Sequence, residues 1–197
     1  MHLEQETKFS GVSFDALRKN LDRLNARQGE MYFEENVVYD TPQRDLNAKE
    51  ILLRLRKGRR NLLTVKRAPE RQDGGAQFKE REEIETEVEN FQALQEILTF
   101  LGFCPVFRYE KFREIWFLGE CHICLDILPF GEFVEIEGRP GTIFECCRLL
   151  GLDPSGGSPK SYYQLHQEYL QSNGLPFQES FVFGIEERMR LKARAGR

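Results

Sequence analysis

The feature that most constrains the fold of this chain is a recurring alternation of charged and apolar residues with a period of two. Glu4, Glu6 and Lys8 alternate in the first such segment, and Arg54 and Arg56 alternate with leucines in a later one. Since successive side chains of a strand point to opposite faces, the charged residues of each segment share one face. The alternation predicts eight strands, at residues 2–9, 34–40, 50–57, 61–67, 78–89, 108–117, 121–128 and 132–138.

These strands are expected to form one sheet closed on itself. Few helical segments separate them, which favours antiparallel pairing, and Gly58 with Arg59 forms a short hairpin turn. The predicted fold class is therefore α+β, an eight-stranded antiparallel β-barrel with helices packed outside. Thr142 and Glu145 are predicted to form a capping box at the start of one helix. Caps and apolar spacing place the helices at 13–26, 91–101, 143–150, 161–172 and 185–195.

The charged faces of the strands require an explanation. For any single pair, a solvated outer face is sufficient. Like charges two residues apart repel each other, however, and the pattern recurs on strand after strand, so a polar, water-filled barrel interior accounts for the set better. The acids of this predicted lining are Glu4, Glu6, Glu83, Glu85, Asp126, Glu135 and Glu137. The bases are Lys8, Arg54, Arg56, Lys66, Lys111 and Arg113.

Such a lining matches one class of ligand. Clustered carboxylates bind hard divalent cations such as Mg²⁺ or Mn²⁺. Clustered arginines and lysines bind phosphate oxygens, and one arginine can contact two oxygens at once. The two sets together predict a site for a metal-complexed polyphosphate, where the cation would neutralise phosphoryl charge and could activate water.

The motifs and their order resemble those of the CYTH superfamily, the triphosphate tunnel metalloenzymes. The similarity covers about residues 2–170, beginning with the E-x-E-x-K motif. The segments that carry it are Glu4 to Lys8, Tyr39-Asp40-Thr41-Pro42, Leu53 to Arg56, Leu63 to Lys66, Arg81 to Glu85, Tyr109 to Arg113, Leu125-Asp126, Gly131 to Glu137 and Lys160-Ser161-Tyr162. The resemblance implies a tunnel domain at residues 1–174, followed by a partly helical C-terminal tail at 175–197.

The same resemblance implies roles for individual residues, with a triphosphate lying along the tunnel. The implied ligands of Mg²⁺ or Mn²⁺ are Glu4, Glu6, Asp126, Glu135 and Glu137. The implied phosphate-binding residues are Lys8, Arg54, Arg56, Lys66, Lys111, Arg113 and Lys160. The implied catalytic residues are Glu83, Glu85 and Asp126, of which Glu83 and Glu85 would order the basic side chains or position water. The register of residues 79–89 stays open by two positions, because Glu87 and Glu89 share the same face.

The reaction is less constrained than the fold, because the superfamily includes inorganic triphosphatases, thiamine-triphosphatases, RNA triphosphatases and class IV adenylate cyclases. Cyclases of this kind have a His-Phe pair ahead of the first motif, whereas only Met1, His2 and Leu3 precede Glu4 here. We expect hydrolysis of inorganic triphosphate, or of an organic triphosphate such as thiamine triphosphate. The alternatives are a cyclase that forms cyclic AMP from ATP and a non-catalytic polyphosphate-binding module.

Composition and charge limit which partners and which cellular location fit the sequence. The net charge of −4 gives no electrostatic footprint for nucleic acid, so no DNA partner is expected. No apolar run is long enough for a membrane span and no signal peptide opens the chain, which predicts a cytoplasmic protein with its five cysteines reduced. The expected partner is a small molecule that contains a triphosphate, and the sequence permits a homodimer. Phe9, Tyr39 and Trp116 are candidates to stack on a base, although ordinary packing accounts for each.

Overall fold

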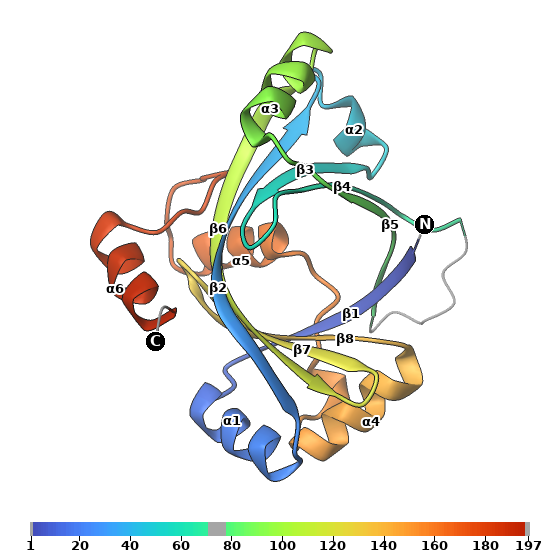
Figure 1. The fold of residues 1–197 in the computed structure, drawn as a ribbon, viewed down its shortest axis with the longest axis vertical. Helices are drawn as coiled ribbons and strands as arrows, with labels where there is room; N and C mark the ends of the chain where they lie inside the picture. The colour runs from blue at the N-terminus through green and yellow to red at the C-terminus, as the bar shows by residue number, and fades with distance from the viewer. Residues whose placement is uncertain (1, 71–77, 196–197) are drawn as a thin grey trace.

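Eight strands form a closed antiparallel barrel in the computed structural model, which describes residues 2–70 and 78–195. The order around the barrel is β1-β5-β4-β3-β2-β6-β7-β8, and β1 closes it by pairing with both β5 and β8 (Figure 1). The predicted fold class is confirmed. The strands are β1 (His2–Ser10), β2 (Arg27–Asp40), β3 (Leu52–Lys57), β4 (Leu62–Arg67), β5 (Lys79–Glu87), β6 (Cys104–Leu118), β7 (Cys121–Leu128) and β8 (Gly131–Glu137).

The helices pack around the outside of the barrel. In Figure 1, α1 and α4 lie together on one side, α2 and α3 lie on the opposite side, and α6 lies beside β2 and β6. Amphipathic spacing explains the positions of the longer helices, whose buried side chains, such as Leu17 of α1 and Ile143 of α4, belong to the apolar core. Their bounds are α1 (Phe14–Arg23), α2 (Asp45–Ala48), α3 (Phe91–Phe100), α4 (Pro140–Leu150), α5 (Tyr162–Ser172) and α6 (Ile185–Ala195), with a 3₁₀ turn η1 (Pro154–Gly156).

Two of the three hydrophobic clusters among the described residues fill the space between the barrel wall and the helices. The larger includes Leu21 of α1, Trp116 of β6, Ile136 of β8 and Ile143 of α4, all at most 2% exposed. The smaller joins Tyr39, Val37, Leu53 and Leu55 to Leu98 of α3. Because the outward side chains of the strands supply these cores, the inward side chains are free to be charged. The three aromatic candidates for base stacking, Phe9, Tyr39 and Trp116, are buried in these cores.

The structure differs from the predicted elements mainly at their ends. β2 begins at Arg27 and β6 at Cys104, earlier than their alternation predicts, because these two long strands pair with each other from Arg27–Phe117 to Asp40–Cys104. The four-residue helix α2 was not predicted.

The predicted capping box of Thr142 and Glu145 is wrong. α4 begins at Pro140, whose missing N–H suits the first turn, and its N-cap is Arg139. The hydroxyl of Thr142 instead donates a hydrogen bond to the carbonyl oxygen of Arg139. The other predicted cap residues, Ser13, Asn90 and Ser161, do cap their helices.

All five cysteines are free thiols. Within residues 2–70 and 78–195, no helix combines the length and the apolar character needed to cross a membrane.

Candidate active site in the barrel interior

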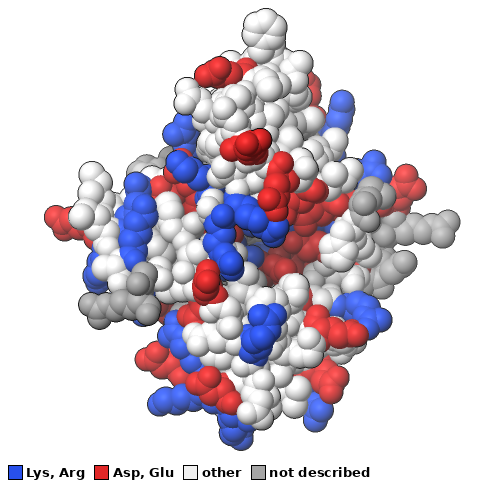
Figure 2. Space-filling view, in the orientation of Figure 1, with Lys and Arg blue, Asp and Glu red and all other residues white. Residues whose placement is uncertain are grey.

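The interior of the barrel contains a cavity of about 1020 Å³. In the space-filling view, red and blue side chains gather around a hollow near the centre of the molecule (Figure 2). Twelve of the thirteen residues predicted to line a polar interior do line this cavity. They are Glu4, Glu6, Lys8, Arg54, Arg56, Lys66, Glu83, Glu85, Lys111, Arg113, Glu135 and Glu137.

Strand register brings these residues together. Residues directly opposite each other in an antiparallel pair point to the same face. Glu6 therefore meets Glu137 and Lys8 meets Glu135 across β1 and β8. Lys66 is likewise opposite Glu83 across β4 and β5.

The open register of residues 79–89 is fixed in the structure. Glu83 and Glu85 line the cavity, and the Thr64 hydroxyl donates a 2.8 Å hydrogen bond to Glu85. Glu87, at the end of β5, is exposed and pairs with Arg60.

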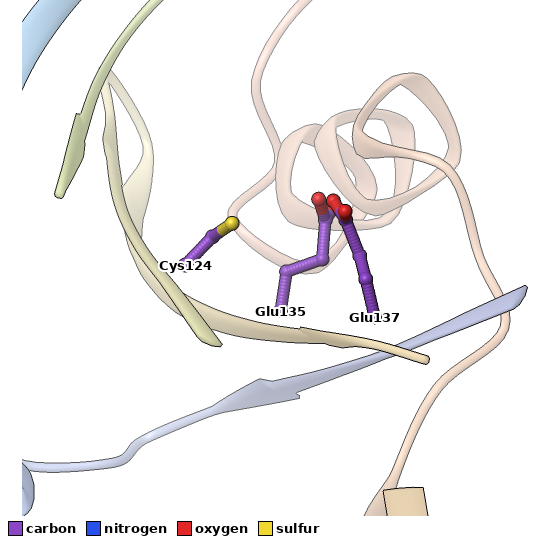
Figure 3. Close-up of side chains that lie close together, drawn as sticks. All are labelled: Cys124, Glu135 and Glu137. Carbon is purple, nitrogen blue, oxygen red and sulfur yellow. The ribbon is translucent and has the colours of Figure 1, made fainter. Parts of the chain in front are cut away.

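Acidic side chains gather on the β1–β8 side of the cavity. Ligand oxygens of Glu4, Glu6 and Glu137 lie within 4.8 Å of one another. Glu137 also belongs to a second group, in which its carboxylate, that of Glu135 and the Sγ of Cys124 converge within the same distance (Figure 3). Carboxylate oxygens at this spacing are suitable ligands for a divalent cation.

The pKa values of these acids reflect how closely their carboxylates lie to one another and to basic groups. Burial and the neighbouring Glu135 raise the pKa of Glu137 well above its ordinary value. Burial also acts to raise the pKa of Glu135, but Lys8, Arg113 and Lys111 together hold it well below the usual range. A cation beside Glu137 would offset the repulsion that raises its pKa, so the donor set fits a divalent metal.

Lys8 lies between two carboxylates at the centre of the site. Its Nζ is 2.6 Å from Glu6 Oε1 and 2.9 Å from Glu135 Oε2, and its side chain is 2% exposed. Burial and Glu135 favour the neutral form of Glu6, yet Lys79, Lys8 and Lys66 outweigh them and lower the pKa of Glu6 to about 2. Lys8 and Glu6 are therefore both charged at neutral pH.

Some basic side chains lie among these acids, since Lys66 pairs with Glu4 and Arg113 pairs with Glu135. Arg54 and Arg56 lie on β3, on the side of the barrel opposite β8. Arg54 Nη1 donates a 2.9 Å hydrogen bond to the hydroxyl of Tyr109. Arg56 bridges Glu34 at 3.1 Å and Glu85 at 2.7 Å. These contacts orient the guanidinium groups while leaving them on the cavity surface.

Two predicted site residues occupy other positions. Asp126 is fully buried and does not line the cavity, because its carboxylate accepts hydrogen bonds from Lys111, Arg113 and Tyr162. Lys160 has a side chain 46% exposed, and its Nζ pairs with Glu168 at 2.5 Å, away from the cavity lining.

The chain before α5 is fixed to β1. The backbone N–H of Lys8 donates to the Ser158 carbonyl oxygen at 3.0 Å, and the Ser158 N–H donates back at 2.8 Å. Gly157 allows this approach, since a Cβ there would lie 2.4 Å from Thr7 Oγ1. As a result, the first residues of α5, including Tyr162, reach the cavity.

Sequence reasoning gave no role to several residues in or beside the cavity, among them Lys79, Tyr109, Glu34 and Tyr162. Lys79 lies 2.7 Å from Glu6 and shares a face with Glu83, so strand alternation could have found it. Tyr109 shares a face with Lys111 and could have been found in the same way. Glu34 had no clear signal because apolar Val38 interrupts its row, and Tyr162 lies on a helix outside the strand pattern.

The sequence matches the family model described as the CYTH domain over residues 2–143. The chain belongs to the CYTH domain family. A protein of Methanocaldococcus jannaschii, provisionally named an adenylate cyclase, is 26% identical over 149 residues, which cover 75% of this chain and 83% of the relative. This family membership confirms the resemblance carried by the motifs.

Solved structures agree with this assignment. A Vibrio parahaemolyticus protein, also provisionally named an adenylate cyclase, has a TM-score of 0.72 and 25% identity, covering 86% of this chain and 98% of its own. The Hippeastrum protein HpAC1 shares the fold, with a TM-score of 0.61, 17% identity, and coverage of 90% of this chain and 98% of its own. HpAC1 carries the name of an adenylyl cyclase and is described as having a dominant triphosphatase activity.

Proposed function

We propose that this protein hydrolyses a triphosphate inside the barrel, with Mg²⁺ or Mn²⁺ as cofactor. The substrate would be inorganic triphosphate or an organic triphosphate such as thiamine triphosphate. The observation that supports this most directly is the opposition of two charged surfaces across one cavity. Carboxylates of β1 and β8 converge on one side, and the guanidinium groups of Arg54 and Arg56, on β3, lie on the other.

The cation would be held by Glu4, Glu6 and Glu137, with Glu135 beside them. When bound, it would neutralise charge on the phosphoryl group and lower the pKa of a coordinated water. Asp126 has a different place in this proposal from the one the family resemblance implies. With Lys111, Arg113 and Tyr162 bonded to it, Asp126 would hold the basic side chains in position.

The phosphate chain would contact the basic side chains directly. Arg54 and Arg56 present planar groups that can bind two phosphate oxygens each. Lys8 and Lys66 lie next to the acids, and would contact phosphate oxygens near the cation.

We assign Glu83 as the proton acceptor for an attacking water. It lines the cavity 3.4 Å from Lys66, and burial, with Glu4 and Glu85 nearby, raises the pKa of its carboxyl. A carboxylate with a raised pKa is a stronger base than an ordinary one. Glu85 accepts hydrogen bonds from Arg56 and Thr64, so we assign it the orientation of Arg56.

Cyclisation of ATP is the second candidate, because aromatic side chains border the cavity. Phe107, Tyr163 and Phe181 line it, and the Phe107 and Tyr163 rings lie 5.1 Å apart. These rings could stack on an adenine base or on a thiamine ring. The triphosphatase activity given for HpAC1 supports hydrolysis, and the names of the Vibrio and Methanocaldococcus relatives support cyclisation.

One product analysis separates the candidates. The purified protein is incubated with Mg²⁺ or Mn²⁺ and inorganic triphosphate, thiamine triphosphate or ATP, and orthophosphate, pyrophosphate and cyclic AMP are quantified. We expect orthophosphate release from a triphosphate, with little cyclic AMP. Formation of cyclic AMP and pyrophosphate from ATP, with inorganic triphosphate left intact, would replace the hydrolase proposal by the cyclase.

A further inference from the structure

A second, smaller cavity of about 330 Å³ adjoins the main one. Arg56 lines both cavities, so the two adjoin at this residue. Glu34 lines the smaller cavity only, yet it contacts Arg56 and Lys111, which both line the larger one. Glu34 therefore lies at the boundary between the two spaces.

Glu34 is an acid in basic surroundings. Its side chain is 1% exposed, with Oε1 3.1 Å from Arg56 Nη1 and Oε2 3.7 Å from Lys111 Nζ. Oε2 makes no hydrogen bond within the described part of the chain. Burial acts to raise the pKa of Glu34, but Lys111, Arg56, Arg113 and Arg54 together lower it far below its ordinary value. The carboxylate is thus a fixed negative charge at neutral pH.

Strand register places this charge beyond the two arginines of β3. Arg54 and Arg56 lie opposite Val38 and Asn36 of β2, and Glu34 is the next residue of β2 on the same face. A phosphate chain that runs from Arg54 to Arg56 therefore approaches the Glu34 carboxylate before the smaller cavity. A phosphate group beside the Glu34 carboxylate would be repelled strongly, because solvent screens two negative charges little in a buried environment. In the opposite direction the main cavity is wide and has aromatic residues at its border.

We propose that Glu34 ends the phosphate path, so that the site accepts a triphosphate end-first, with a free terminal phosphoryl group against Arg56. This inference rests on the proposed function and narrows its substrate class. Inorganic triphosphate and triphosphates esterified at one end fit, with the ester group in the wide part of the main cavity. A chain that must pass beyond Arg56 does not fit.

The smaller cavity provides a way to test whether Glu34 is a stop, that is, the residue that ends the phosphate path. Arg59 and Arg60 line it, with side chains 59% and 68% exposed, and pair with Glu30 and Glu87. They are too far along the path to contact phosphate while Glu34 is charged. Without that charge, a longer chain could enter the smaller cavity and reach them.

The experiment measures calorimetric binding of inorganic triphosphate and pentaphosphate in chelator, where no metal-dependent turnover occurs. Glu34→Gln should raise the affinity for pentaphosphate by about tenfold more than that for triphosphate, as one or two added charged hydrogen bonds would. Adding Arg59→Ala and Arg60→Ala to Glu34→Gln should remove this extra gain. Glu35→Gln is the matched control and should show no such gain. Glu35 is the next residue of β2 and lines neither cavity.

A second comparison does not depend on the Glu34 variant folding. In the otherwise unaltered protein, Arg59→Ala with Arg60→Ala should change the affinity for both polyphosphates by less than about twofold, because screened, exposed charges contribute little. A large selective loss for pentaphosphate would overturn the proposed stop. An equal gain for both chains in Glu34→Gln would also overturn it while leaving the triphosphate site intact. Failure of the unaltered protein to bind either polyphosphate would overturn the proposed stop, because that proposal needs a phosphate path along Arg54 and Arg56. The product analysis with Mg²⁺ or Mn²⁺ tests the hydrolase proposal separately.

Discussion

The hydroxyl of Tyr162 donates a 2.7 Å hydrogen bond to Asp126 Oδ2, which connects the first residue of α5 to the inner surface of the barrel. The Tyr162 ring also faces the ammonium groups of Lys8 and Lys111, at 5.0 and 5.3 Å from its centroid. Asp126 accepts further bonds from Arg113 and Lys111. One buried contact thus couples an outer helix to the basic side chains of the cavity.

Removing this hydroxyl tests that coupling. Tyr162→Phe should lower the free energy of unfolding by about 1–3 kcal/mol, because a buried carboxylate loses one of its donors. Urea unfolding measures this change, and the phosphate-release assay should show reduced turnover. Tyr163→Phe is the control, since its hydroxyl makes no hydrogen bond to the residues the structure describes. Equal effects of the two changes would refute the role given to Tyr162.

Arg54 should contribute directly to triphosphate affinity. Arg54→Ala should weaken binding by about 1–3 kcal/mol, the range for charge-assisted hydrogen bonds. Arg54→Lys should also weaken it, because lysine lacks the planar fork. Arg67→Ala is the matched control, on the same sheet but outside the cavity, with a side chain 49% exposed and paired with Glu82. Calorimetric affinities that match the unaltered protein in both Arg54 variants would contradict the site.

The barrel and most of its lining could be predicted because strand geometry is strict. A period of two fixes which side chains share a face, so Glu4, Arg54 and Glu137 could be assigned to one interior before any contact was known. Closure follows from the number of strands and the short connections. The pairing of particular residues, such as Lys8 with Glu135, depends on register and could not be read from any single strand.

The sequence predictions that differ from the structure depend on features other than strand alternation. Lys160 and Tyr162 are two residues apart at a helix start, where no alternation tells which side chain turns inward. Tyr162 enters the cavity and Lys160 pairs with Glu168. Thr142 matched a capping pattern, but Pro140 starts the helix earlier. Asp126 was placed on the correct face, yet its burial under three donors depends on side-chain packing that a sequence pattern does not describe.

Glu137 should determine the affinity for divalent cations. Its carboxylate belongs to both groups of potential ligands, so Glu137→Gln should weaken Mn²⁺ binding by at least about tenfold, which paramagnetic resonance of free Mn²⁺ can measure. The change should also raise the unfolding temperature of the metal-free protein, because repulsion from Glu135 is removed. Glu132→Gln, at the exposed start of β8, is the control. Unchanged Mn²⁺ affinity would exclude Glu137 as a ligand.

Glu114 should make stability depend on pH. Burial acts to raise its pKa, but hydrogen bonds from Arg18, Trp116 and Gln28 lower it below the ordinary value. A lowered pKa stabilises the fold above the unfolded value, near 4.3, and this contribution disappears as the pH falls through the folded value. Glu114→Gln should therefore cost about 1–3 kcal/mol at pH 7 and less at pH 3.

Chemical unfolding at both pH values measures this difference. Asp15→Asn is the control, because Asp15 also pairs with Arg18 but its side chain is 88% exposed, so its loss should cost less than about 1 kcal/mol. A cost for Glu114→Gln that is the same at pH 3 and pH 7 would show that the ionised carboxylate is not what stabilises this region.

Cys124 should give the acidic side of the cavity an affinity for soft cations. Its thiol is 1% exposed and opposes Glu135 across β7 and β8, with Sγ directed toward the carboxylates of Glu135 and Glu137 (Figure 3). Burial raises the pKa of this thiol well above its ordinary value, so the free protein holds it protonated at neutral pH. A soft cation can displace that proton and bind the thiolate, whereas Mg²⁺ binds only the oxygens.

We expect Cd²⁺ to produce an ultraviolet thiolate charge-transfer band and to compete with Mn²⁺. Cys124→Ser should abolish the band, and Cys104→Ser, whose thiol donates to the Asp40 carbonyl oxygen instead, should retain it. A band that persists in Cys124→Ser and survives competition with Mn²⁺ would place the bound Cd²⁺ at other cysteines and remove Cys124 from the cation site.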